Sequence, residues 1–135
     1  MNILVADDER ISRKTISRIV QNLGQFIAVD NGKTAFASFI KAHESGHPFD
    51  LIILDVGMPG MLGTEVLFYI RKFEEKKNIE PAKRSKVVII TSHSDEETVK
   101  NSIKHQCNAY LIKPLNREKV IGKISELFNI DPEGK

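Results

Sequence analysis

The apolar run at residues 49–55 constrains the fold more than any other stretch of this chain. It reads FDLIILD, and the turn residues VGMPG follow it. An apolar run of this length, rich in Ile and Leu, is typical of a strand buried on both faces of a parallel sheet. Because ligands of open α/β sheets bind outside the carboxyl ends of the strands, Asp55 is a candidate site residue. The alternative is that Asp55 only starts a turn, with its carboxylate accepting from nearby backbone N–H groups.

The rest of the chain alternates between short apolar runs and segments of helical periodicity. Apolar runs predict further strands at 2–6, 26–29, 86–90 and 109–112. Apolar residues at helical spacing predict helices within 10–23, 35–40, 66–73, 95–106 and 120–128. Each strand needs a crossover helix to return in the same direction, and such crossovers are right-handed. The expected fold class is therefore α/β, a doubly wound (βα)5 three-layer sandwich around a parallel five-stranded sheet.

Two segments differ from this regular pattern. The helix expected at 95–106 has only Val99 and Ile103 as clear apolar anchors, so we expect it to be weakly held. Residues 71–86 contain seven Lys or Arg against three Glu. We expect a solvated helix end and loop there, and a docking surface for an acidic partner is the alternative.

Composition limits the classes of protein that this chain can belong to. It has 135 residues, 41% of them hydrophobic, which suits one domain; we assign 1–128 to it and 129–135 to a C-terminal tail or the start of a linker. The formal charge is +2, with no basic stripe carrying aromatics, so direct binding to nucleic acid is not expected. Cys107 is the single cysteine and cannot form an internal disulfide. With no signal peptide or membrane-spanning run, we expect a cytoplasmic protein without membrane insertion.

Polar residues follow four of the five expected strands. Asp7 and Asp8 come after the first strand, Asp55 after the third, Thr91 after the fourth and Lys113 after the fifth. Three carboxylates at one sheet edge repel one another unless a cation lies between them, and hard oxygen ligands favour Mg²⁺. Because Mg²⁺ in proteins usually keeps positions for water and phosphate oxygens, the set points to phosphoryl chemistry. An ammonium and a hydroxyl would stabilise the phosphoryl oxygens, and a carboxylate could be the nucleophile.

Four motifs in this order resemble the receiver domain of response regulators in two-component signalling, of the CheY-like type. The motifs are Asp7-Asp8, Asp55-x-x-Met58-Pro59 with Gly63, Thr91-Ser92, and Lys113-Pro114. The resemblance extends from residue 2 to about residue 128. It implies the strand order 2-1-3-4-5 and a cis peptide bond between Lys113 and Pro114.

The resemblance also implies a role for each residue of the acidic edge. Asp55 would accept a phosphoryl group from the phosphohistidine of a sensor histidine kinase or phosphotransfer protein. Asp8, Asp55 and the backbone carbonyl of Gly57 would bind Mg²⁺ directly, and Asp7 through water. Lys113 would pair with the phosphoryl oxygens. Such a domain catalyses its own phosphorylation and dephosphorylation and is not a stand-alone enzyme.

A switch is the second implication of the resemblance. Thr91 would move to the phosphoryl group, and Tyr110 would turn inward when it does. The elements expected at 95–106, 109–112 and 120–128 would then bind a downstream protein target or a second copy of the chain. Gly57 and His93 depart from common family patterns at positions that flank the path of hydrolytic water, which bears on the lifetime of the phosphorylated form.

Simpler or different interpretations exist for the same residues. Asp8 could be only a helix N-cap, Lys113 a solvated residue before a turn proline, and Tyr110 a half-buried strand aromatic. A flavodoxin-like protein is disfavoured because the carboxylates at 7–9 would repel the phosphate of FMN. A haloacid dehalogenase-type phosphatase would need an Asp-x-Asp motif on the first strand, and none is present. A receiver-like adaptor that acts without phosphorylation remains the alternative function.

Overall fold

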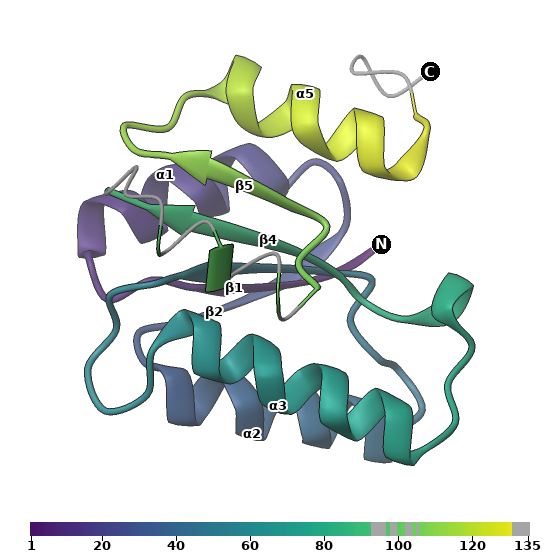
Figure 1. Cartoon of the computed structure of the whole chain (residues 1–135). Helices are drawn as coiled ribbons and strands as arrows, with labels where there is room; N and C mark the ends of the chain where they lie inside the picture. The colour runs from purple at the N-terminus through teal and green to yellow at the C-terminus, as the bar shows by residue number, and fades with distance from the viewer. Residues whose placement is uncertain (93–96, 98–99, 102–103, 105, 131–135) are drawn as a thin grey trace.

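The computed structural model describes residues 1–92, 97, 100, 101, 104 and 106–130, which form three layers (Figure 1). The central layer is a five-stranded sheet of order β2-β1-β3-β4-β5, with every neighbouring pair parallel. The strands are β1 Asn2–Ala6, β2 Gln25–Val29, β3 Leu51–Asp55, β4 Lys86–Thr91 and β5 Ala109–Ile112. The expected α/β class, the parallel sheet and the order 2-1-3-4-5 are confirmed.

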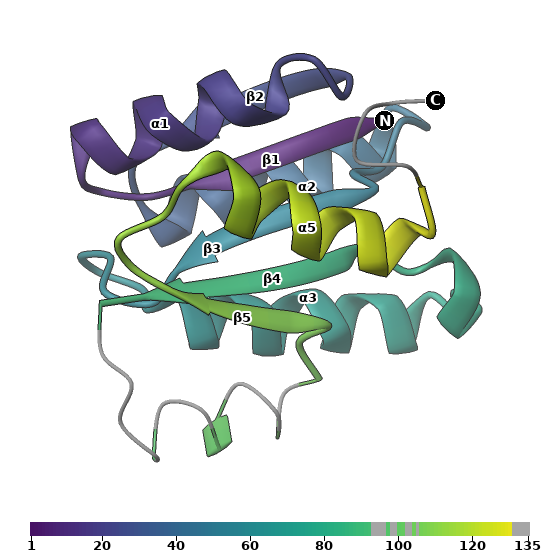
Figure 2. The ribbon, with the colours of Figure 1, turned by 90° about the horizontal axis from the view of Figure 1, so that it is seen from above.

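Helices cover both faces of the sheet (Figures 1 and 2). One face carries α1 Arg10–Val20 and α5 Arg117–Phe128, and the other carries α2 Gly32–Glu44 and α3 Gly63–Lys76. A single 3-10 turn among the described residues, η1 Pro81–Lys83, leads from α3 to β4. The turn before α2 caps that helix, because the Asn31 side chain accepts from the Thr34 backbone N–H at 2.8 Å.

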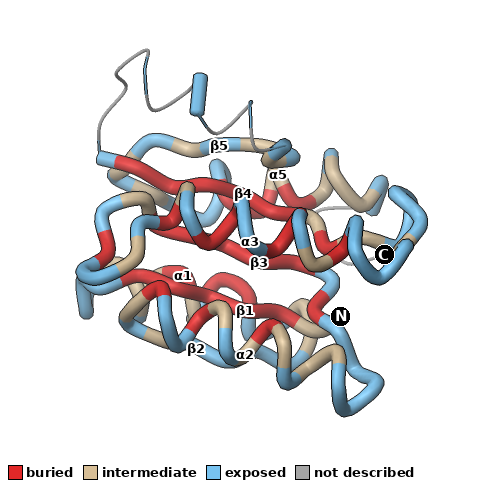
Figure 3. Tube along the Cα trace, turned by 60° about the horizontal axis from the view of Figure 1, so that its bottom comes forward, coloured by how far each residue is buried: buried red, intermediate tan, exposed pale blue. Residues whose placement is uncertain are grey.

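β3 lies at the centre of the sheet and is buried along its whole length (Figure 3). Its side chains alternate between the two faces, so Leu51 and Ile53 pack in the cluster under α1 and α5. Ile52 and Leu54 pack in the cluster under α2 and α3. Each fully buried aliphatic side chain stabilises the fold by about 1.5–3 kcal/mol, so β3 is anchored from both sides. This anchoring fixes the position of Asp55 at its end.

The helix expected at 95–106 is described only in part. Residues 97, 100, 101 and 104 are helical and exposed. Val99 and Ile103, the two anchors on which the weak-packing prediction rests, lie outside the described residues.

The charged segment 71–86 is only partly solvated. Lysines such as Lys72 and Lys76 are exposed, as predicted, but Arg71 and Glu74 are buried and the prediction is wrong for them. Arg71 Nη1 donates to Glu74 Oε1 at 2.7 Å and to the Ser85 carbonyl at 2.8 Å. Arg71 Nη2 donates to Asn108 Oδ1 at 2.8 Å. A buried guanidinium that is satisfied in this way ties α3 to the amino ends of β4 and β5.

The loop after β3 returns to pack against the strand end at Gly63. The Gly63 N–H donates to the Val56 carbonyl at 3.0 Å. A Cβ added at Gly63 would lie 2.2 Å from the Asp55 carbonyl oxygen and 2.8 Å from its carbon. Only glycine permits this approach, which fixes the backbone of Asp55 from the loop side.

We predict that Gly63→Ala lowers the free energy of unfolding by about 1–3 kcal/mol, because the new methyl group forces the loop away from Asp55. Urea unfolding followed by circular dichroism measures the change. Gly122→Ala is the matched control, since a Cβ at Gly122 in α5 meets nothing within 4 Å. The control should gain up to about 1 kcal/mol from helix propensity. Equal stability of Gly63→Ala and the parent would contradict the prediction.

Candidate functional site

The parallel sheet brings the polar residues of four strands to one edge. Asp7 follows β1, Asp55 ends β3, Thr91 ends β4 and Lys113 follows β5. The hydrogen-bond ladder extends just beyond the strands, since the Lys113 N–H donates to the Thr91 carbonyl at 2.8 Å. The Val56 N–H likewise donates to the carbonyl of Ile90 at 3.0 Å. The strand ends are therefore fixed relative to one another before any side chain is considered.

Three carboxylates converge at this edge. One ligand oxygen of each of Asp7, Asp8 and Asp55 lies within 4.8 Å of the others. Asp7 and Asp55 are buried, and Asp8 is exposed. The Glu9 N–H donates to Asp7 Oδ1 at 2.9 Å, and Arg13 Nη1 from α1 donates to the Asp7 carbonyl at 2.9 Å. The Glu9 backbone thus fixes the carboxylate of Asp7, and the Arg13 side chain fixes its backbone carbonyl.

Lys113 is the cation of the site, and several carboxylates face it. Its Nζ lies 3.2 Å from Asp7 Oδ2 and 3.6 Å from Asp55 Oδ1, and it also contacts Glu9 Oε1. Burial lowers the pKa of Lys113, but the hydrogen bond to Glu9 and the charges of Asp55 and Asp7 outweigh burial, so its pKa lies above the ordinary value. Lys113 therefore stays protonated at neutral pH.

Asp55 has the most perturbed environment among the described residues of the site. Its pKa is raised from 3.8 to about 7, chiefly by burial and next by the negative charge of Asp7, which together outweigh the lowering by Lys113. Hydrogen bonds to Asp8 and Asp7 also favour the protonated form. A single ammonium therefore does not compensate the carboxylates that meet here.

The residues present fit a divalent cation. Asp7 Oδ2 is buried and accepts no hydrogen bond, although the Lys113 ammonium faces it. Such an oxygen, next to two more carboxylates, is suited to bind a hard metal ion or one of its water ligands. The structure thus supports the predicted acidic site at Asp7, Asp8 and Asp55.

The remaining predicted site residues that the structure describes lie on β4, on β5 and in the loops after β3 and β5. Thr91 is buried, and Gly57 is exposed in the loop after β3, where a Cβ would meet nothing within 4 Å. Tyr110 lies on β5 with 40% of its surface exposed. The Lys113-Pro114 bond is cis, as the resemblance implied. His93 lies outside the described residues.

Glu9 is the site residue that sequence analysis missed. It follows Asp7 and Asp8 in the acidic run 7–9, and the resemblance gives a role to the two aspartates but none to Glu9. Its carboxylate reaches Lys113 across the mouth of the pocket. Only the fold brings residue 9 and residue 113 together, so the run itself carries no signal for the contact.

Comparisons with known proteins agree with this geometry. Residues 3–125 match the response regulator receiver domain. The chain is 31% identical over 126 residues to the chemotaxis protein CheY of Treponema pallidum, covering 93% of this chain and 81% of that protein.

Two solved structures share the fold closely. One is a chain in the crystal structure of the CheX-CheY-BeF3-Mg²⁺ complex from Borrelia burgdorferi, with a TM-score of 0.80 and 25% identity, covering 95% of this chain and 89% of that chain. The other is the receiver domain of the histidine kinase CKI1 from Arabidopsis thaliana, complexed with Mg²⁺ and BeF3⁻. It has a TM-score of 0.79 and 28% identity, with coverage of 95% and 89%.

The chain belongs to the response regulator receiver domain family. It is a CheY-like module of two-component signalling and not a stand-alone enzyme. Its acidic pocket at Asp7, Asp8 and Asp55 is consistent with a phosphoacceptor site. Within the described part of the chain, we find no helix with the length and apolar character needed to cross a membrane.

We predict that Asp55→Asn stabilises the protein in the absence of Mg²⁺. The folded protein binds a proton at Asp55 more tightly than the unfolded chain, so stability is lost as the pH rises from 3.8 to about 7. The amide cannot ionise, and the variant should gain about 1–3 kcal/mol near pH 8 with a chelator and less near pH 5.

Urea unfolding with and without Mg²⁺ measures this gain. Mg²⁺ should reduce it, because the cation compensates the ionised carboxylates of the parent. Asp50→Asn is the control, since Asp50 is exposed at the opposite end of β3 and should show no gain. A gain that is equal at both pH values would contradict the electrostatic cause.

Proposed function

We propose that the chain is the phosphoacceptor of a two-component system and that Asp55 takes a phosphoryl group from the phosphohistidine of a histidine kinase or phosphotransfer protein. The convergence of Asp7, Asp8 and Asp55 with Lys113 at the carboxyl edge of the sheet carries this proposal. Receiver domains pair with histidine kinases, which is consistent with the family of this chain. We propose a cytoplasmic location, where such kinases present their phosphohistidine.

The reaction exchanges one phosphorus bond for another. An Asp55 carboxylate oxygen attacks the phosphorus, a P–O bond forms, and the P–N bond to the histidine breaks. The released imidazole nitrogen keeps the electron pair and takes a proton from solvent. Since the phosphoryl group transfers in line, the donor must approach from the open side of the pocket.

Asp8, Asp55 and the Gly57 carbonyl would hold Mg²⁺, with Asp7 acting through water. When bound, the cation supplies positive charge to the carboxylates and to the phosphoryl oxygens. Two relatives of the same fold were solved with Mg²⁺ and beryllofluoride, which supports a divalent cation at the acidic pocket of this chain.

Lys113 and Thr91 would act on the phosphoryl oxygens. The Lys113 ammonium already lies 3.6 Å from Asp55 Oδ1, within reach of an oxygen attached there. Charge on the equatorial oxygens of the transferring group is stabilised by such a cation. Thr91 is buried at the end of β4 and pairs with β5. A movement of its hydroxyl toward a phosphoryl group on Asp55 would therefore be transmitted to β5.

We predict that the parent takes up one phosphoryl group from acetyl phosphate only when Mg²⁺ is present. In that reaction acetate leaves as the Asp55 acyl phosphate forms. Asp55→Asn should take up none, because an amide is a poor nucleophile and removes a metal-binding charge. Asp50→Asn, at the residue just before the same strand, should react like the parent.

Intact mass spectrometry measures the uptake. A full phosphoryl gain in Asp55→Asn would refute the assignment of the acceptor. A parent that gains no phosphoryl group with Mg²⁺ would favour the adaptor that acts without phosphorylation.

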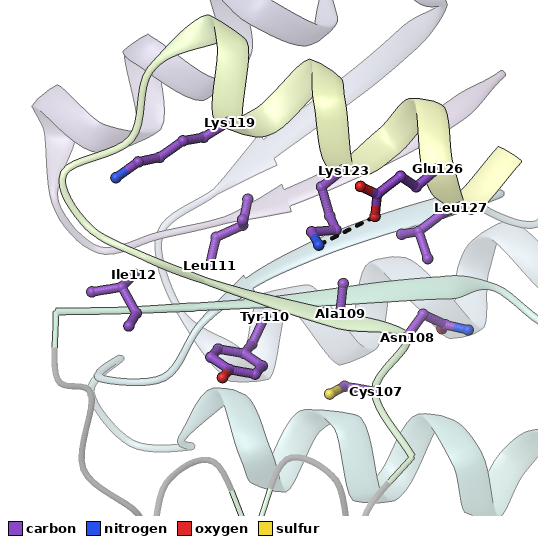
Figure 4. A pocket seen from close by; sticks show the side chains of 10 residues that line it. All are labelled: Cys107, Asn108, Ala109, Tyr110, Leu111, Ile112, Lys119, Lys123, Glu126 and Leu127. Atoms are coloured by element: carbon purple, nitrogen blue, oxygen red, sulfur yellow. Dashed lines mark hydrogen bonds and ion pairs between the residues drawn. The ribbon is translucent and has the colours of Figure 1, made fainter. Parts of the chain in front are cut away.

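We further propose that the face formed by β5 and α5, with the segment at 95–106, binds the downstream target or a second copy. A groove of ≈ 660 Å³ runs between β5 and α5 (Figure 4). Tyr110 and Ile112 line it with partly exposed apolar surface, and the Tyr110 ring lies on the side of β5 away from α5 (Figure 4). The Lys123–Glu126 ion pair at 3.3 Å lies along α5. A partly apolar groove with charged margins is suited to protein binding.

We predict that Thr91→Ala and Tyr110→Ala keep Asp55 reactive but weaken the response of β5 and α5. In the parent, beryllofluoride with Mg²⁺ should shift the amide NMR signals of both elements, because Thr91 and Tyr110 rearrange together. Each variant should lose most of that shift while Asp55 still takes a phosphoryl group.

Tyr69→Ala is the matched control for this prediction. Tyr69 is a comparably exposed tyrosine on α3 and does not line the groove. The control should respond like the parent. Unchanged responses in both switch variants would show that Thr91 and Tyr110 do not couple the site to this face.

A further inference from the structure

Glu9 has an unusual position at the start of α1. It occupies the N-cap, yet its side chain makes no capping hydrogen bond. Its backbone is fixed at both ends, because its N–H donates to Asp7 Oδ1 at 2.9 Å and its carbonyl accepts from the Arg13 N–H at 2.9 Å. The carboxylate is therefore free to reach Lys113, and it does so.

Among the carboxylates that the structure describes, Glu9 is the one closest to the ammonium of Lys113. Its Nζ contacts Glu9 Oε1, lies 3.2 Å from Asp7 Oδ2 and lies 3.6 Å from Asp55 Oδ1. An ammonium has three donors, and the distance to Asp55 is longer than a hydrogen bond. Lys113 is thus drawn toward the mouth of the pocket and away from the acceptor.

Glu9 differs in accessibility from the other two carboxylates that face Lys113. The side chain of Glu9 is 61% exposed, whereas those of Asp7 and Asp55 are 0% and 7% exposed. A cation bound among Asp7, Asp8 and Asp55 would compensate those charges and leave Glu9 with Lys113. The contact with Glu9 is therefore the one with which a phosphoryl oxygen has to compete.

We propose that Glu9 is a positioning residue that restrains Lys113 at the mouth of the pocket and so slows phosphorylation of Asp55. The inference rests on the proposed function. Breaking the contact releases the ammonium toward the phosphoryl oxygens. An ion pair this exposed contributes little, so the rate should rise only about two- to fivefold.

Two variants separate the contact from the charge of Glu9. Glu9→Gln removes the charge and weakens the contact, while Glu9→Asp keeps the charge on a side chain one methylene shorter. Loss of negative charge alone would also speed the approach of an anionic donor, but salt screens that effect. Glu44→Gln, at the far end of α2, changes the net charge equally without touching the site.

The decisive experiment measures phosphorylation by acetyl phosphate with saturating Mg²⁺ at low and high salt. Both Glu9 variants should react faster than the parent, mainly through the maximal rate rather than the donor concentration at half-maximal rate, and high salt should not abolish the gain. Glu44→Gln should react like the parent. The proposal is overturned if Glu9→Asp matches the parent or if the gain of Glu9→Gln disappears at high salt.

A second measurement needs no phosphoryl transfer. The ¹⁵N NMR signal of the Lys113 ammonium should be sharp in the parent, because the contact slows its exchange with water, and broadened in both Glu9 variants. If the parent takes up no phosphoryl group, the proposed function fails, and the ammonium signal still reports the contact by itself. If the parent is phosphorylated but the signal is the same in all three proteins, the restraint by Glu9 is refuted.

Discussion

The burial of Asp7 and Asp55 side by side, with Asp8 close by, is the interaction on which the rest of this structure depends. Two carboxylates removed from water and a third near them repel one another, and the raised pKa of Asp55 reflects that cost. The apolar packing on both faces of β3 stabilises the fold and offsets the destabilisation by these carboxylates. The site is therefore suited to bind a cation, because a bound cation would relieve the repulsion between the carboxylates.

Restraints from outside the pocket keep the carboxylates in place. The Arg13 guanidinium holds the backbone of Asp7, and the tight packing of Gly63 holds that of Asp55. At the opposite end of the sheet, Arg71 ties α3 to Ser85 and Asn108, which fixes the amino ends of β4 and β5. The proposed rearrangement would therefore involve the carboxyl end of the sheet, where Thr91 lies.

Much of the fold could be predicted because its signals are local. The apolar run ending at Asp55 and the helical spacing in α1 and α5 report burial residue by residue, and both are confirmed. The segment 71–86 shows where local signals fail. Its charges suggest a solvated surface, yet the burial of Arg71 and Glu74 depends on Ser85 and Asn108, which the fold brings to them.

The sequence by itself determined that five strands alternate with helices and that Asp7, Asp8, Asp55, Thr91 and Lys113 each stand at a strand end. Parallel pairing then had to collect them at one edge, because every strand points the same way. Only the tertiary structure decided how close the Lys113 ammonium lies to each of the carboxylates of Glu9, Asp7 and Asp55. Those distances depend on how α1 begins and how the chain leaves β5, and residues so far apart in sequence carry no local pattern for them.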